Sequence, residues 1–273
     1  MRNIYCLALS LLFISVSTSA QTVYDLNVAT TLAKSNNKLI LLDFTASWCG
    51  PCAKMETEFW NNGDYKSITD KFVIAKIDID LERAIAAKYN VTSIPHIKVI
   101  NINGDELFGF LGYPGPSTIA KELKDFPGSV SGLYESMEFA DAVKPNAEEC
   151  MGAGAGLQGI AQTCTGNAKK IFLNESNAYF KKCKKLSKDE ILTQQAALGM
   201  ALNEVLGGNP KKALSDVNVN AVKPENKGLA LYILAQANIN LNDKDKAQHY
   251  VQQLQILNDD SWKPLITLLQ KQL

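Results

Sequence analysis

The chain has 273 residues, a length that suggests two domains as a first expectation. Its 28 basic and 28 acidic side chains give a formal net charge of zero. This argues against a nucleic-acid partner, because a nucleic-acid-binding protein needs a basic surface. The apolar fraction of 46% is ordinary for a globular chain with a buried core.

Residues 1–20 have the pattern of a secretory signal peptide. Arg2 gives a positive start, residues 6–16 are apolar, and residues 17–20 are small, as at a cleavage site. The apolar stretch is too short to span a bilayer, and no later stretch is long and apolar enough to do so. We therefore expect cleavage near Ala20 and an exported protein.

The next hundred residues predict an α/β sheet covered on both faces, because strand and helix patterns alternate. The expected helices cover residues 22–37, 53–59, 64–71, 81–89 and 116–126. The expected strands cover residues 38–44, 72–78, 96–102 and 106–111, with Asn103-Gly104 as the hairpin turn between the last two.

The junction after strand 38–44 carries Trp48-Cys49-Gly50-Pro51-Cys52. A helix N-terminus favours an anion, and the thiolate is the form of cysteine that attacks disulfides. Cys49, at the start of the helix, is therefore the expected nucleophile. Cys52 lies deeper in the helix and is the expected resolving thiol, while Pro51 suits the first helical turn.

A structural zinc site and an inert disulfide are the alternatives for this cysteine pair. Zinc needs four ligands, and the chain has no second C-x-x-C motif and only two histidines, His96 and His249. An inert disulfide is unexpected at an exposed strand–helix junction, since strained and exposed disulfides are the labile ones. We therefore expect a redox-active dithiol, with neither a metal nor a cofactor.

These residues resemble the active site of the thioredoxin family over about residues 22–127. Asp43 falls where thioredoxins carry a buried acid behind the second cysteine, and Lys76 matches the lysine that approaches it. Ile94-Pro95 matches the cis-proline loop, and Gly112 matches the glycine that closes the substrate groove. The resemblance implies a thioredoxin fold. The catalytic residues that it implies are Asp43, Cys49, Cys52 and Pro95, and the client-binding residues are Trp48, Gly50, Pro51, Ile94 and Gly112.

The chain departs from the family pattern at four places. Thr45 replaces a common aromatic residue, Thr57 replaces a helix-kinking proline, and His96 follows the proline where thioredoxins often have threonine. Residues 61–65 break the first helix, as in extracytoplasmic thioredoxin-like domains. These departures bear on the redox potential and the client surface. His96 could tune Cys49 or could point away from it.

The resemblance implies an enzyme that exchanges disulfides with client proteins. The Gly-Pro pair between the cysteines resembles reducing thioredoxins, so we expect the reducing direction. A reducing protein in an oxidising compartment needs electrons, which implies a membrane-bound donor. A single thioredoxin unit with no C-terminal retention tetrapeptide favours a bacterial periplasm.

Two other functions stay open. The protein could be a binding or scaffold protein whose helical half recruits a partner. It could also be a disulfide oxidase or isomerase; an isomerase would be expected to dimerise, and no dimerisation segment is evident before the thioredoxin-like domain.

The remainder of the chain predicts helices only. We expect a signal peptide at 1–20, a thioredoxin-like domain at 21–128, a connector at 129–145 and a helical domain at 146–273. Within about residues 190–258 the sequence matches itself at an offset of 34 residues: Ala201 with Ala235, Lys212 with Lys246 and Ala213 with Ala247. This period resembles tetratricopeptide repeats, which are paired helices; a bundle without repeats is the alternative.

Three further cysteines would remain after signal cleavage. We expect Cys150 to pair with Cys164, because both flank one glycine-rich stretch and the compartment is oxidising. Cys183 lies among lysines, which predicts an exposed, charged helix face and a lowered thiol pKa. The stretch 154–159 fits G-x-G-x-x-G but follows no strand, so we expect no nucleotide binding.

Overall fold

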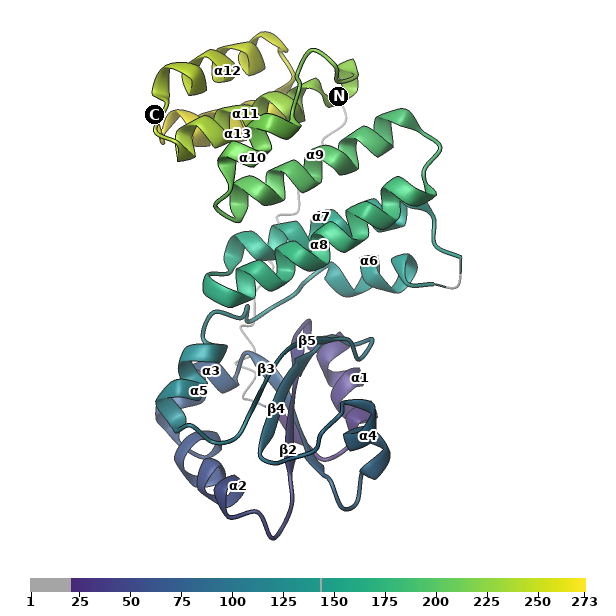
Figure 1. Ribbon diagram of the computed structural model, residues 1–273, viewed down its shortest axis with the longest axis vertical. Coiled ribbons are helices and arrows are strands. Elements are labelled where there is room, and N and C mark those ends of the chain that lie inside the picture. Colours follow the sequence, from purple (N-terminus) through teal and green to yellow (C-terminus); the bar gives the residue numbers. More distant parts are fainter. Residues whose placement is uncertain (1–20, 143) are drawn as a thin grey trace, which may run out of the picture.

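The computed structural model describes residues 21–142 and 144–273, so the predicted signal peptide lies outside the described residues. Along the long axis of the molecule, strands with their helices lie at one end, and a stack of helices fills the rest (Figure 1). The predicted fold class is confirmed by this order of an α/β unit and an all-helical region. None of the described helices combines the length and the apolar character that a membrane crossing requires.

The first half is built on a five-stranded sheet in the order β1-β3-β2-β4-β5. The strands are β1 (Gln21–Val23), β2 (Leu39–Thr45), β3 (Phe72–Asp78), β4 (His96–Ile100) and β5 (Glu106–Leu111). β2 is flanked by parallel β3 and antiparallel β4. All but the last residue of β2 are buried, because both faces of the sheet are covered.

Helices cover both faces of this sheet (Figure 1). On one face lie α1 (Leu26–Asn36) and α4 (Arg83–Lys88), which pack on Ile40 and Phe44. On the other face lie α2 (Gly50–Met55), the π-helical turn η1 (Glu56–Trp60) and α5 (Pro116–Leu123). Asp43 alternates with Phe44 along β2 and therefore lies on the α2 side.

Local signals set the ends of these helices. Asp25 starts α1 by accepting hydrogen bonds from the N–H groups of Asn27 and Val28 at 2.7 and 2.9 Å. The predicted helix over 22–37 is therefore wrong at its start, where residues 21–23 form the edge strand β1. That strand has three residues, too few to show a periodic pattern.

The interruption predicted at residues 61–65 is present. The π-helical turn η1 ends at Trp60, and Asn62 then accepts a hydrogen bond from the N–H of Asp64 at 3.0 Å. This starts the short 3-10 turn η2 (Gly63–Tyr65), which leads into α3 (Lys66–Thr69). Thr57, where the family has a kinking proline, lies inside η1.

The described residues after β5 and α5 form helices only. They are α6 (Leu133–Ala140), α7 (Ala147–Thr163), α8 (Gly166–Leu186), α9 (Glu190–Leu206), α10 (Pro210–Asp216), η3 (Pro224–Asn226), α11 (Lys227–Asn240), α12 (Lys244–Ile256), η4 (Asp260–Trp262) and α13 (Lys263–Gln270). α9 with α10 and α11 with α12 make two successive helix pairs. Ala213 and Ala247, 34 residues apart, are both fully buried in the second helix of their pair. The pairing agrees with the 34-residue self-match.

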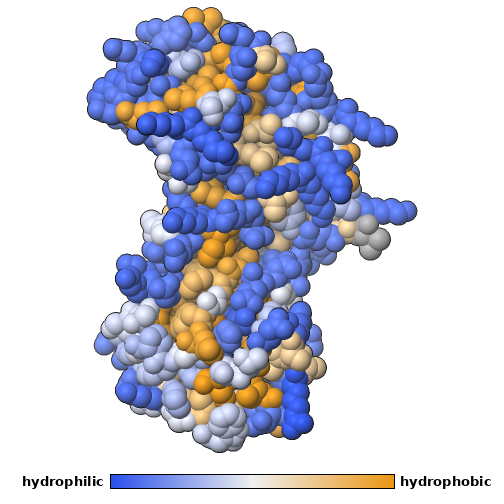
Figure 2. All heavy atoms as spheres, viewed as in Figure 1, coloured by the Kyte–Doolittle hydropathy of each residue, from blue (hydrophilic) through white to orange (hydrophobic). Residues whose placement is uncertain are grey.

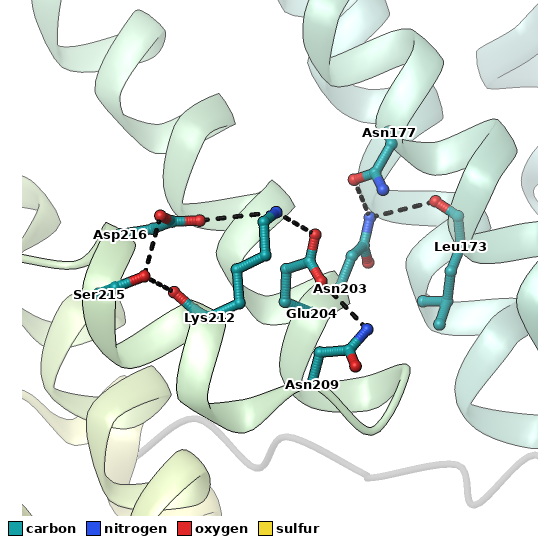
Figure 3. Close-up of polar contacts among 8 residues, drawn as sticks. All are labelled: Leu173, Asn177, Asn203, Glu204, Asn209, Lys212, Ser215 and Asp216. Carbon is teal, nitrogen blue, oxygen red and sulfur yellow. Dashed lines mark hydrogen bonds and ion pairs between the residues drawn. The ribbon is translucent and has the colours of Figure 1, made fainter.

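A buried amide ties three of these helices together. Asn203 of α9 donates from Nδ2 to Ser176 Oγ at 2.9 Å and to Asn177 Oδ1 at 2.8 Å, both on α8. The same nitrogen lies beside the carbonyl of Leu173 (Figure 3). Gln158 of α7 donates to Asn203 Oδ1 at 2.7 Å. This connected network fixes how α7, α8 and α9 sit against one another.

The first helix pair has an exposed set of polar contacts beside this amide (Figure 3). Lys212 of α10 pairs with Glu204 Oε1 of α9 at 2.5 Å, and Asp216 lies 3.7 Å away. Asn209, in the turn between the helices, donates to Glu204 at 3.3 Å. Surface ion pairs of this kind add little stability, so the buried alanines do more to hold the pair.

The two halves of the molecule share one hydrophobic core. The ring of Phe126, just after α5, lies 5.9 Å from that of Phe72 in β3 and 6.5 Å from that of Phe172 in α8, between centroids. The same core continues from β2 to Ala196 in α9. Figure 2 shows apolar residues in a band that runs along the molecule from the sheet end onto the helices.

The segment predicted as a connector contains a packed helix. Within it, Tyr134 of α6 donates from Oη to the carbonyl of Lys38 at 2.5 Å, and the N–H of Val130 donates to the carbonyl of Asn37 at 2.7 Å. These contacts attach α6 to the start of β2. The division of the chain at residues 128 and 146 stays a prediction.

Candidate functional site

The two cysteines of the C-G-P-C motif form a disulfide at the junction between β2 and α2. Their Cα atoms are 5.2 Å apart. Cys49 caps α2, and its Sγ accepts a hydrogen bond from the N–H of Cys52 at 3.2 Å. This places Cys49 sulfur where a helix N-terminus stabilises a thiolate, as the sequence predicted.

Exposure does not distinguish the two sulfurs in the oxidised pair. Cys49 and Cys52 are each 5% exposed and lie in one small apolar cluster with Ala46, Ile79 and Ile94. The expected roles, Cys49 as nucleophile and Cys52 as resolving thiol, therefore stay a prediction for the dithiol form. The position of Cys49 at the helix start, outside the first turn, is what separates their roles.

Three of the predicted client-binding residues lie within the disulfide motif or directly before it. Trp48 is 66% exposed, and its Nε1 donates to Asp80 Oδ2 at 2.7 Å, which holds the indole beside the motif. Gly50 and Pro51, between the cysteines, are exposed.

The Ile94–Pro95 peptide is cis, as the resemblance implied. The N–H of Gly112 donates to the Pro95 carbonyl at 2.8 Å, and Gly112 has a φ of 86°, a region that favours glycine. The proline loop and the glycine predicted to close the groove are therefore joined directly.

Asp43 is a buried carboxyl group on the α2 side of the sheet. It is 2% exposed, and its Oδ1 has no hydrogen-bond partner. Burial raises the pKa of Asp43 to about 7; Lys76 opposes that rise and Glu56 adds to it. Trp60 lies close enough to lower this pKa, but its indole N–H completes no hydrogen bond. A carboxyl group that titrates near neutral pH can take and return a proton.

Lys76, which the resemblance places near Asp43, forms no ion pair with it. The two residues are register partners on β3 and β2, but the Nζ of Lys76 bonds to Glu56 Oε2 instead. The sequence analysis missed Glu56. Its signal was its place four residues after Cys52, one helical turn further along the same face.

His96 lies away from the face that carries Asp43. It pairs in register with Phe44, and the two rings meet edge-on with centroids 6.4 Å apart. Burial lowers the pKa of His96, and Lys98 lowers it further. The interpretation in which His96 points away from the disulfide is therefore the one that fits.

The predictions for the other three cysteines are wrong. Cys150, Cys164 and Cys183 are free thiols, and all three are buried. Cys150 and Cys164 lie near opposite ends of α7, too far apart for a disulfide at 1.5 Å of rise per residue. Cys183 does not face solvent, and burial raises its pKa to about 11.

The glycine-rich stretch 154–159 lies inside α7 and follows no strand, so it lacks the context of a dinucleotide fingerprint. Across residues 21–142 and 144–273, no group of three or more histidine, cysteine or acidic side chains could hold a metal ion.

The geometry defines a class of protein before any comparison. A C-x-x-C disulfide at the start of the helix after a central strand, beside a cis-proline, is the site of a thiol–disulfide oxidoreductase. The family model "Thioredoxin" matches residues 18–125. Thioredoxin H-type from Oryza sativa subsp. indica is 37% identical over 103 residues, which are 37% of this chain and 82% of that protein. The chain belongs to the thioredoxin family.

Two longer relatives share the same kind of region. The TPR repeat-containing thioredoxin TDX of Arabidopsis thaliana is 36% identical over 77 residues, 28% of this chain and 20% of that protein. Protein disulfide-isomerase of Ricinus communis is 28% identical over 149 residues, 50% of this chain and 30% of that protein. The chain thus spans less than a third of either relative. The first relative fits the combination of a thioredoxin unit with a helical region.

Proposed function

We propose that this protein is an exported oxidoreductase that reduces disulfides in client proteins through Cys49 and Cys52. The observation that carries the proposal is the position of the Cys49 sulfur, which accepts the N–H of Cys52 in the first turn of α2, beside an exposed Trp48. A thiolate in that position is stabilised by the helix N-terminus and can attack a client that binds beside the exposed Trp48.

The exchange would run in two steps. The Cys49 thiolate attacks one sulfur of a client disulfide, the client S–S bond breaks, and the other client sulfur leaves as a thiolate that takes a proton from water. Asp43 carboxylate then takes the Cys52 proton, and the Cys52 thiolate attacks Cys49. The bond between Cys49 and the client breaks as the Cys49–Cys52 disulfide forms, and the second client sulfur leaves as a thiolate that takes up one proton as Asp43 gives one up. Two electrons have then passed from the enzyme dithiol to the client.

Turnover in this direction needs a source of two electrons for the Cys49–Cys52 disulfide. The signal pattern of residues 1–20 supports export. The compartment that we propose is a bacterial periplasm, which is kept oxidising. A membrane-bound dithiol donor is the class of partner that could supply those electrons there. The reduction potential of the couple decides the direction, and a strongly oxidising value would favour a disulfide oxidase or isomerase.

Single-cysteine variants test the proposed exchange. We expect Cys52→Ser to keep client proteins covalently attached through Cys49, because nothing resolves the mixed disulfide. Cys49→Ser should form few such adducts. The readout is a set of bands on non-reducing gels that disappear with reductant, alongside an insulin-reduction assay of the parent. The buried Cys150, Cys164 and Cys183 can stay in place, since they are shielded from clients.

A folded parent protein that neither reduces insulin nor forms adducts would favour the second candidate, a binding protein. The observation behind that candidate is an open hollow of about 930 Å³ at the turns of the two helix pairs. It is lined by Asn209, Lys212, Asn240 and Leu241, among others. Adducts from Cys49→Ser and not from Cys52→Ser would mean that the two cysteine roles are exchanged.

A further inference from the structure

Glu56 is placed to control the surroundings of the buried carboxyl group of Asp43. It is the first residue of the π-helical turn η1, which continues directly from α2. Its side chain is 38% exposed and reaches the Nζ of Lys76, whose side chain is only 11% exposed. Glu56, Trp60 and Lys76 together line a hollow of about 370 Å³ that opens to solvent.

Lys76 is the one cation that faces Asp43 from a neighbouring strand. The two are register partners on β3 and β2, so their side chains leave the same face of the sheet. On its other side, Asp43 is opposite the apolar Ile97 of β4. From the helix layer come the Glu56 carboxylate and the Trp60 indole. The charges around Asp43 are therefore one ammonium and one carboxylate, already bonded to each other.

This arrangement leaves Asp43 without a counter-ion of its own. An ammonium group shared with a second carboxylate stabilises the ionised form of Asp43 less than an unshared one would. Oδ1 of Asp43 accordingly has no hydrogen-bond partner. The effect on the pKa has the matching sign, since Lys76 lowers the pKa of Asp43 and Glu56 raises it.

We propose that Glu56 is a positioning residue for the resolving step: by binding Lys76 it keeps the ammonium from pairing with Asp43, and so leaves that carboxyl group free to take the Cys52 proton. In this role Glu56 needs no contact with the client or the sulfurs. It acts through Lys76 on the group that moves the proton. The inference rests on the proposed dithiol exchange and adds to it a residue outside the C-x-x-C motif and the proline loop.

The test compares Glu56→Gln with Glu58→Gln. Glu58 lies on the same turn with similar exposure, but it pairs with Lys54 and accepts from Tyr113 Oη, so its variant removes the same charge without freeing Lys76. The titration midpoint of Asp43 is read from its side-chain carboxyl carbon by NMR, with Asp43→Asn used to assign the signal. In Glu56→Gln we expect the midpoint to fall by on the order of one pH unit, as the freed ammonium favours the carboxylate. Lys76→Met should move it upward, and Glu58→Gln should leave it in place.

The second readout is the pH dependence of oxidation of the reduced protein by an excess of a disulfide peptide in a single turnover. The part of the pH–rate profile that reflects ionisation of Asp43 should move to lower pH by the same amount in Glu56→Gln. It should not move in Glu58→Gln. Equal midpoints in these two variants would overturn the inference even if insulin reduction is intact. A parent that performs no exchange would instead overturn the proposed function, and the NMR midpoints would still report whether Glu56 controls Asp43.

Discussion

Asp43 is buried, and the Oδ1 atom of its carboxyl group has no hydrogen-bond partner. Its pKa lies near 7 in the folded protein, against 3.8 as the ordinary value. The folded state therefore holds this proton more tightly than the unfolded state does. The free energy of unfolding is then greatest below pH 3.8 and falls as the pH rises from 3.8 to about 7. Above pH 7 the whole destabilisation from the buried, ionised Asp43 is present.

Replacing Asp43 with asparagine should remove that cost, because the amide stays neutral at every pH. We expect Asp43→Asn to raise the free energy of unfolding by up to about 4 kcal/mol above pH 7, and by little near pH 4. The same variant should slow disulfide exchange near neutral pH. Urea unfolding of both proteins across this range gives the measurement, and a stability difference independent of pH would contradict the assignment of the raised pKa.

Among single residues, the sequence predicted those whose roles follow from local spacing or from the family resemblance. Cys49 and Cys52 were found because a helix start can be read along the chain, and Pro95 because it matches the cis-proline loop of the thioredoxin family. Glu56 was missed because its pairing depends on how η1 lies over β3. Cys183 was misread because the lysines around it indicated exposure, while the packing of α8 buries it.

Among the elements, the crossing of α7, α8 and α9 depends on two glycines that admit an aromatic ring. A Cβ atom added to Gly154 of α7 or to Gly199 of α9 would lie 2.6 Å from the Phe180 ring of α8. The ring is fully buried between these helices, so it has little room to move. The helices approach closely because both positions lack a side chain.

Alanine at Gly154 should therefore destabilise the protein by about 1–3 kcal/mol through overpacking. Gly152 lies in the same helix with no atom within 4 Å of an added Cβ, so Gly152→Ala should be neutral or stabilise by up to about 1 kcal/mol. Thermal or urea unfolding of the two variants measures the difference. Equal stabilities would mean that Phe180 can move aside.

The helix pairs themselves were predictable, since alanines at a fixed offset mark positions where two helices meet. The start of α7 carries a local signal that the sequence analysis did not use, because Asn146 and Glu149 form a capping box. The buried Asn203 network could not be predicted, because its hydrogen bonds join residues 26 to 45 positions apart in the sequence and leave no local pattern.

For the whole molecule, the shared core bears on where the chain can be cut. A fragment of residues 21–128 would leave Phe126 without Phe172 and would remove Tyr134 from the carbonyl of Lys38. We expect this fragment to be less stable than the full chain. A fragment of residues 21–141 should recover part of the loss, because α6 brings its contacts with the start of β2.

Circular dichroism during urea unfolding distinguishes the three proteins. The full chain should unfold in a single transition, since one core spans both halves. Two separate transitions, with the first half as stable alone as in the full chain, would show that residues 21–128 form an independent domain as the composition of the sequence suggested.

The disulfide lies at one tip of an elongated molecule, and the last helix pair lies at the other (Figure 1). Because one packed core joins the described residues of the sheet to α7, α8 and α9, the two ends of the molecule keep a fixed separation and orientation. The last helix pair itself could not fold back over Cys49. The helical half would then serve as a spacer, which sets how far from its attachment point the protein can reach a disulfide.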